Sequence, residues 1–334
     1  MNTAIPVLRR SAKVSRRDGR VLIQHLDEEI SLEGAGAALL DRMLPLLDGK
    51  NKIEQIAARL EESPARVRSL ADSLRGAGVV SYLDPGHEGG GTMTGAEFYA
   101  VHQRYSRYWL RDVYQHPLWD KITNGTASRA QVIGFAFEKY HYIEGAYEHM
   151  AVAAANSTKE MMPHLARHFI EEYLHGDIYR KGLQSLFPDD LVVHAQPLPS
   201  TRALVNFLSE TAARSSFAYY AGNEVLQLTE NTSDGEVSGS IDTFYDAMRK
   251  HYPWSDRLVA SFIAHTHADQ KLGHENVFLE MCASVPPLSA AEVKDALNVA
   301  KLMTEHLMLF MDGIDLHYQN HPAGPRVPCT LLSE

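Results

Sequence analysis

The sequence is poor in cysteine and has no long apolar segment. Among its 334 residues only Cys282 and Cys329 are cysteines, and they do not form a C-x-x-C pair. This argues against a cysteine zinc site or a dithiol redox pair. No stretch approaches the ~20 apolar residues of a membrane span, and the N-terminal residues lack the apolar run of a signal peptide. We therefore expect a cytoplasmic, reducing location and no membrane partner.

Basic residues are also in short supply. The formal net charge is −10 and the sequence pI is about 5.9, which argues against a general nucleic-acid binder. Residues 1–84 hold 13 basic and 12 acidic side chains, whereas residues 85–334 hold 19 and 30. We expect no nucleic-acid partner, and the acidic character belongs to the later part of the chain.

The first part of the chain predicts a small domain of strands and helices over residues 1–83. Short alternating runs between residues 6 and 32 predict strands joined by an Asp18-Gly19 turn. Helical spacing then predicts three helices over 34–49, 51–63 and 64–78, the last opening at Ser63-Pro64. A strand closes the module at 79–83. This order is typical of a small α+β, winged-helix-like domain.

A Pro/Gly-rich segment, residues 84–95, predicts a linker. Everything after it has helical spacing, with long amphipathic stretches between Pro, Gly and Asn breakers. We expect an all-α bundle over 96–320 and an irregular tail over 321–334. The fold class is therefore mainly α, with a small α+β domain ahead of a helical bundle.

Histidine is the residue that stands out. The chain has 17 histidines, and all but His25 follow residue 85. A single histidine is more often a surface or core residue than a ligand. Only histidines in helical phase with a carboxylate or with another histidine indicate a site, because residues i, i+3, i+4 and i+7 share one face of a helix.

Three segments show such phasing. They give a predicted set of metal ligands: Glu138, His141, Glu172, His175, His267 and His274. Helical bundles build carboxylate-rich metal sites from inward-facing Glu and Glu-x-x-His positions. Mixed imidazole and carboxylate ligation with open positions suits Fe(II) and O2. Four further residues are expected as ligands or as partners that orient a ligand: Glu171, His168, Asp269 and His149.

The third segment runs from His267 to His274. Lys271 lies between these two histidines, on the same face of the predicted helix, and interrupts the pattern. An ammonium group has no lone pair for a metal. One metal can remain, Asp269 or Glu275 can substitute, or the pocket works without metal. Lys271 can instead pair with a glutamate or act as nucleophile or base. Tyr220, within a Tyr-Tyr pair on a predicted helix, is a second candidate for a catalytic or tuning role.

The run ISLEGAGAALLDRMLPLLDGKNKIEQIAARL, followed by VRSLADSLRGAGVV, resembles a peptide-recognition domain of modified-peptide pathways. The pyrroloquinoline quinone peptide chaperone is the best-known form of that domain. The resemblance covers residues 6–83. It implies that a leader peptide adds as an extra strand between Glu29–Leu32 and the helix Arg66–Arg75. The implied peptide-binding residues are Glu29, Ile30, Leu32, Arg66, Leu70 and Leu74.

The second part resembles the heme-oxygenase-like superfamily over residues 98–318. The resemblance is carried by HPLWDKITNG, FAFEKYHYIEGAY, FIEEYLHGDIYRKGL and HADQKLGHENVF in that order. This superfamily includes thiaminase-II-like proteins, the cofactorless pyrroloquinoline quinone synthase and non-heme di-iron oxidases. It implies one or two irons, O2 as cosubstrate and a homodimer. In the oxidases an Asp is usual at the position of Lys271. Thiaminase activity is disfavoured because Cys282 lies in the wrong segment.

Together these features predict an iron-dependent, O2-using oxidase or oxygenase of natural-product biosynthesis. Its substrate is expected to be a ribosomally made precursor peptide whose leader is held by the N-terminal domain, with other pathway enzymes as further partners. Two rivals stay open at this point: a cofactorless oxidase like the quinone synthase, and a non-catalytic adaptor that presents the leader to a partner enzyme. A winged-helix transcription regulator is disfavoured by the charge.

Overall fold

The computed structural model describes residues 5–9, 12–26, 28–83, 92–230, 241–272, 277–321 and 324–327. For residues 28, 83, 227–230, 241–242 and 269–272 it describes the backbone alone. The chain divides into two compact units. The N-terminal unit comprises Met1–Val101 and Pro286–Val293, and the helical unit comprises His102–Val285 and Lys294–Glu334. The fold is mainly α, with a small β-containing unit ahead of a helical bundle.

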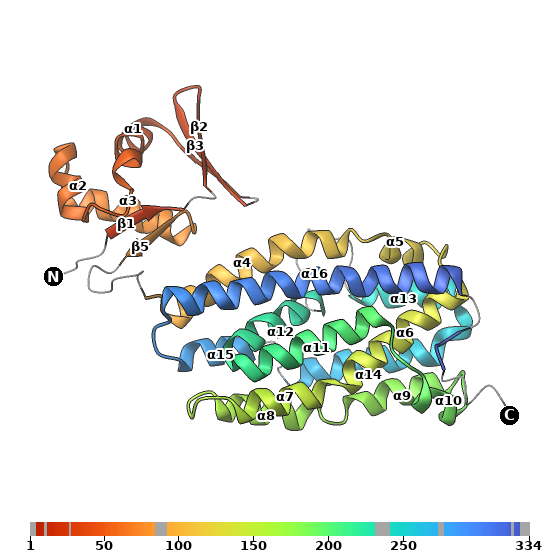
Figure 1. Ribbon diagram of the computed structural model, residues 1–334. Coiled ribbons are helices and arrows are strands. Elements are labelled where there is room, and N and C mark those ends of the chain that lie inside the picture. Colours follow the sequence, from red (N-terminus) through yellow and green to blue (C-terminus); the bar gives the residue numbers. More distant parts are fainter. Residues whose placement is uncertain are drawn as a thin grey trace. The chain divides into compact units, whose positions relative to one another are not determined.

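The N-terminal unit has strands first, then helices, then a final strand, as predicted (Figure 1). The elements are β1 (Ile5–Leu8), β2 (Lys13–Arg17), β3 (Arg20–His25), β4 (Glu28–Leu32), α1 (Gly34–Met43), the 3-10 helix η1 (Leu44–Leu46), α2 (Ile53–Leu60), α3 (Pro64–Gly76) and β5 (Val80–Leu83). Strands β2, β3 and β4 form one antiparallel sheet in that order, and β1 pairs with β5 in another.

Local chemistry accounts for two of these boundaries. The predicted β2–β3 turn is confirmed, since Asp18 and Gly19 both have positive φ, 50° and 74°, as a tight hairpin turn requires. Ser63 caps α3 by accepting a hydrogen bond from the Arg66 amide. The helix expected to reach Gly49 instead ends at Met43 and tightens into η1, because Pro45 cannot continue an α-helical hydrogen-bond ladder.

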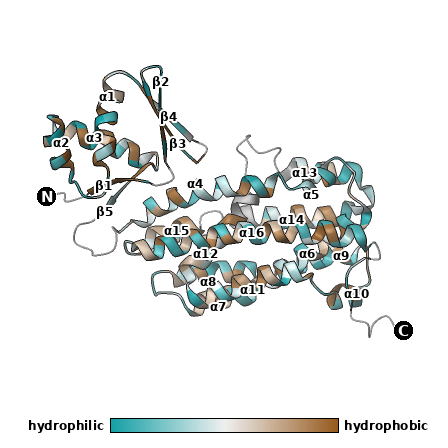
Figure 2. Ribbon diagram, turned by 45° about the horizontal axis from the view of Figure 1, so that its top comes forward, coloured by the Kyte–Doolittle hydropathy of each residue, from teal (hydrophilic) through white to brown (hydrophobic). Residues whose placement is uncertain are grey.

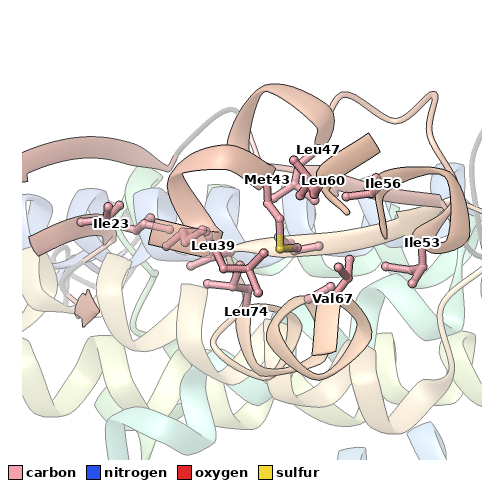
Figure 3. Close-up of a cluster of buried hydrophobic side chains, with 14 of the residues drawn as sticks. Ile23, Leu39, Met43, Leu47, Ile53, Ile56, Leu60, Val67 and Leu74 are labelled. Carbon is pink, nitrogen blue, oxygen red and sulfur yellow. The ribbon is translucent and has the colours of Figure 1, made fainter. Parts of the chain in front are cut away.

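The core of the N-terminal unit joins its helices to β3. Figure 3 shows Ile23 of β3 in the same buried cluster as Leu39 and Met43 of α1 and Val67 and Leu74 of α3. Leu74 is buried, so its side chain stabilises the unit rather than facing a peptide. Partly buried apolar side chains flank this core: Ile30 and Leu32 from β4 and Leu70 from α3. Among the described strands β4 pairs only with β3, so its other edge carries no strand.

The helical unit is built from long helices that run side by side (Figure 1). They are α4 (Gly95–Tyr114, which begins in the N-terminal unit), α5 (Pro117–Thr123), α6 (Arg129–Glu144), α7 (Ala146–Ala155), α8 (Met162–Glu172), α9 (His175–Gln184), α10 (Asp189–His194), α11 (Pro199–Arg214), α12 (Ser216–Glu230), α13 (Ile241–His251), the 3-10 helix η2 (Pro253–Ser255), α14 (Asp256–Leu272), α15 (Val277–Ser284) and α16 (Ala290–Asn320). Figure 2 shows apolar and polar residues on different sides of the same helices, as a bundle requires.

Two stretches with helical spacing, residues 128–155 and 158–186, are each split into two helices in the structure. The stretch 128–155 divides at Gly145, between α6 and α7. The stretch 158–186 divides at Tyr173 and Leu174, where the Leu174 backbone leaves helical geometry (φ −109°, ψ 5°). Glu172 therefore ends one helix and His175 begins the next. The expectation that this pair shares one face of one helix is wrong, although the two side chains still meet.

Helix α6 approaches α16 so closely that Gly134 has no room for a side chain. A Cβ atom at Gly134 would overlap the ring of Tyr318. One turn later on the same face of α6, Glu138 accepts a hydrogen bond from the Tyr318 hydroxyl at 3.0 Å. The missing side chain thus lets Tyr318 lie across α6 and reach Glu138.

None of the helices among the described residues combines the length and the apolar character needed to cross a lipid bilayer.

Candidate metal centre

Three buried side chains from different segments converge inside the helical unit. Glu172 comes from the end of α8, His175 from the start of α9 and His265 from α14. Each offers one ligand atom, and these atoms all lie within 4.8 Å of one another. Two imidazole nitrogens and one carboxylate oxygen at this spacing have the chemistry to hold a divalent transition-metal ion.

Packing between α9 and α14 brings the two histidines together. The His175 and His265 ring centroids are 4.9 Å apart, in an edge-on arrangement. Tyr179, one turn after His175, is fully buried and lies edge-on to His265 with centroids 5.0 Å apart. Its ring also contacts Phe262 at 5.1 Å. Both histidines are therefore buried against packed aromatic rings, so that displacement of either imidazole would disturb its neighbours.

Glu172 lies between imidazoles on both sides. Its Oε2 is 3.0 Å from Nδ1 of His175, and its Oε1 is 3.6 Å from Nε2 of His168, one turn earlier on α8. Glu172 and His175 are 7% and 6% exposed, whereas His168 is 1% exposed. The carboxylate is thus almost removed from water and is stabilised by polar rings rather than by solvent.

Behind these residues, two adjacent tyrosines on α12 each contact a histidine. The Tyr219 hydroxyl oxygen lies 2.6 Å from Nδ1 of His149 on α7, and that of Tyr220 lies 3.0 Å from Nδ1 of His168. All four side chains are buried. Burial, and secondarily the neighbouring His168, lowers the pKa of His149 to about 3, so its ring is neutral at pH 7. Burial also raises the pKa of both tyrosines, so they keep their protons.

Glu138, a predicted metal ligand, instead forms hydrogen bonds with three other residues of the helical unit. Its Oε2 accepts hydrogen bonds from the Leu198 amide at 2.9 Å and the Thr201 hydroxyl at 2.6 Å, and its Oε1 accepts one from Tyr318. Burial raises its pKa, and these three bonds oppose that shift. Because Leu198 and Thr201 open α11, Glu138 caps that helix from a distance.

His141, the partner of Glu138 in the predicted pair, is half-buried. Its Nε2 is buried and has no hydrogen-bond partner among the described residues. Burial, followed by the charge of Arg202, lowers its pKa to about 4. Among the described residues, the cluster of Glu172, His175 and His265 is the one group with metal-ligand spacing, and it includes neither Glu138 nor His141.

On α14 the residue that lies near Glu172 and His175 is His265, whereas the sequence indicated His267. His267 is exposed, because it lies two residues after His265 and therefore about 200° around the helix from it. His265 was missed, but a signal for it exists: Leu258, Phe262 and His265 repeat at i, i+4 and i+7 and are all buried. The side chains of Asp269 and Lys271, and all of His274, lie outside the described residues. Glu171 is half-buried.

Comparison with known proteins agrees with this architecture. Residues 102–222 match the model of the TENA/THI-4/PQQC family, a segment that contains Glu172 and His175 but not His265. A domain of unknown function with a heme oxygenase-like fold from Shewanella denitrificans OS217 is 21% identical, with a TM-score of 0.54, over 68% of this chain and 95% of that one. The helical unit has a heme oxygenase-like fold.

A second solved structure agrees with the heme oxygenase-like unit. A TenA homologue from Pseudomonas syringae pv. tomato str. DC3000 is 11% identical, with a TM-score of 0.50, over 65% of this chain and 92% of that one. No curated protein sequence matches the chain. At these identities the likeness concerns the fold of the heme oxygenase-like unit, so the chemistry has to be argued from its own residues.

Replacement of His265 separates the two candidate histidines of α14. His265→Ala removes one of three donors, and we expect it to weaken Zn²⁺ binding at least 100-fold. His267→Ala, two residues away and exposed, is the matched control and should bind within about twofold of the wild type. Competition with a chromophoric chelator measures both affinities. Equal loss in the two variants would contradict the assignment of His265.

Replacement of Glu138 tests its structural role. Glu138→Gln keeps the shape but cannot accept all three hydrogen bonds, so we expect it to lower the free energy of unfolding of the helical unit by about 2–3 kcal/mol. Metal affinity should stay unchanged. Glu144→Gln, an exposed carboxylate on the same helix, should cost less than about 0.5 kcal/mol. Denaturant titration measures both variants, and a loss of metal binding in Glu138→Gln would return Glu138 to the site.

Proposed function

We propose that the heme oxygenase-like unit is a metal-dependent redox enzyme that binds one iron through Glu172, His175 and His265 and uses O2. The observation that carries this proposal is the buried group of two histidines and one carboxylate. That donor set is typical of non-heme Fe(II) oxygenases, because three protein ligands leave positions open for O2 and substrate. When bound, Fe(II) would supply the activation of O2 and the one-electron steps.

The surrounding residues suit such a site. One carboxylate partly offsets the charge of the metal, and the neutral imidazoles add none. Burial of the donors excludes bulk water, which protects reactive species from side reactions. Tyr220, which contacts His168, keeps its proton, so it is not an anionic ligand.

Anaerobic loading with Fe(II) tests the proposal. The wild type should bind about one equivalent of iron and consume O2 when it is admitted. Glu172→Gln replaces the only anionic donor of the group with a neutral amide, and we expect at least a tenfold loss of both signals. His267→Ala should behave as the wild type. A wild type that binds Zn²⁺ but neither binds Fe(II) nor consumes O2 would make the site a non-redox metal site.

For the N-terminal unit we propose binding of a peptide along the edge of β4 that none of the described strands covers, with the leader of a precursor peptide as ligand. Addition of a strand to a sheet edge uses main-chain hydrogen bonds for affinity and side-chain pockets for selectivity. Along β4, Glu29 and Ser31 are exposed whereas Ile30 and Leu32 are half-buried, so one side of the strand is apolar. Leu70 of α3 adds a third apolar side chain.

Arg66 has a different setting from these apolar residues. Its guanidinium group pairs with Glu62 at 3.0 Å on the exposed side of α3. A leader held by the N-terminal unit would raise the local concentration of the attached core peptide for the redox site in the same chain. The proposed substrate is therefore a ribosomally made peptide, modified by oxidation.

A peptide that binds β4 should distinguish the two sides of that strand. Peptides selected from a random displayed library on the wild-type chain serve as probes, measured by fluorescence anisotropy. Ile30→Lys places a charge on the apolar side, and we expect at least tenfold weaker binding. Ser31→Lys adds the same charge on the exposed side and should change binding less than threefold. Circular dichroism checks that both variants are folded. Equal affinities would contradict binding along β4.

A further inference from the structure

Tyr220 and Tyr219 are neighbours with the same chemistry, but the histidines that they contact have different further partners. His149, on α7, has its one described hydrogen bond with Tyr219, and its Nε2 is buried with no hydrogen-bond partner among the described residues. His168, on α8, faces Tyr220 with Nδ1 and Glu172 with Nε2. Tyr220 is thus linked to Glu172 by contacts through the His168 ring, whereas the hydrogen bond described for Tyr219 ends at His149.

The proton on His168 can be placed by elimination. A neutral imidazole has one N–H and one lone pair. If Nε2 carried the lone pair, it would face the carboxylate oxygen of Glu172 at 3.6 Å inside a buried site, where two acceptors repel. Nε2 therefore carries an N–H, and in the neutral form of the ring Nδ1 accepts from the Tyr220 hydroxyl at 3.0 Å.

The two oxygens of Glu172 consequently have different partners. Oε1 faces the N–H of His168, and Oε2 faces His175, which belongs to the proposed metal site. The 3.6 Å contact is longer than a hydrogen bond, but in a buried site the N–H still attracts Oε1 electrostatically and favours this orientation of the carboxylate. This leaves Oε2 as the oxygen presented to the histidines of the site.

We propose that Tyr220 is a positioning residue of the metal centre: acting through His168, it orients the Glu172 carboxylate so that one oxygen is presented to the metal. The inference rests on the proposed function, because Glu172 is taken as a ligand. It concerns residues that contact a metal ligand rather than the metal itself. Mutation of such residues typically lowers metal affinity 10–100-fold.

Zinc affinity of the full chain, measured with Zn²⁺ alone against a chromophoric chelator, tests the inference. Tyr220→Phe removes one hydroxyl and should weaken binding about 10–100-fold. Tyr219→Phe removes an equally buried hydroxyl next to it and should stay within about twofold. In a His168→Phe background, Tyr220→Phe should add no further loss, because its effect passes through His168. Melting temperatures of the metal-free variants separate positioning from general destabilisation, which would lower them without this pattern.

The outcomes separate the inference from the proposed function. If the wild type binds no Zn²⁺, the metal site and the inference both fall. If the wild type binds and Tyr220→Phe binds equally well, or adds its own loss in the His168→Phe background, only the inference falls. Should Tyr220→Phe not fold, His168→Gln decides: its amide N–H can still reach Glu172, so it should retain more affinity than His168→Phe, and equal loss overturns the inference.

Discussion

The helical unit depends on how a buried carboxylate is kept stable. Glu172 is almost removed from water, which costs several kcal/mol for an ionised group without partners. Imidazoles on both sides offset this cost, His175 within 3.0 Å and His168 within 3.6 Å. Each is in turn fixed by a neighbour, His175 by the His265 ring and His168 by Tyr220. Polar residues of four helices, α8, α9, α12 and α14, are thus arranged around one negative group.

Glu138 shows the same problem solved without histidine. It is buried within the same unit, and its partners are an amide and two hydroxyls from α11 and α16. Hydrogen-bond donors of this kind give each oxygen of Glu138 at least one partner. Two glutamates with identical sequence spacing to a histidine therefore have different surroundings in the fold. The Glu138 carboxylate accepts hydrogen bonds from residues of the fold, whereas the Glu172 carboxylate faces imidazole rings.

Sequence alone could predict what depends on near neighbours. The Asp18-Gly19 turn, the Ser63 cap, the order of strands and helices and the all-α bundle follow from local chemistry and periodicity. Glu172 and His175 were found because they are close in the chain. His265 was not, because choosing between it and His267 requires knowing which side of α14 packs on α9. The role of Glu138 was hidden for a similar reason: Thr201 and Tyr318 are 63 and 180 residues away.

The break between α8 and α9 has a consequence for how the site is assembled during synthesis. Only Tyr173 and Leu174 separate Glu172 from His175, so these two donors are close to each other as soon as the ribosome has released them. The third donor is made 90 residues later than His175 and joins only when α14 packs against α9. If the proposed site binds a metal, a nascent chain would at first offer it two weak ligands. Tight binding would require the closed bundle, so the metal would favour the completed fold over every earlier stage.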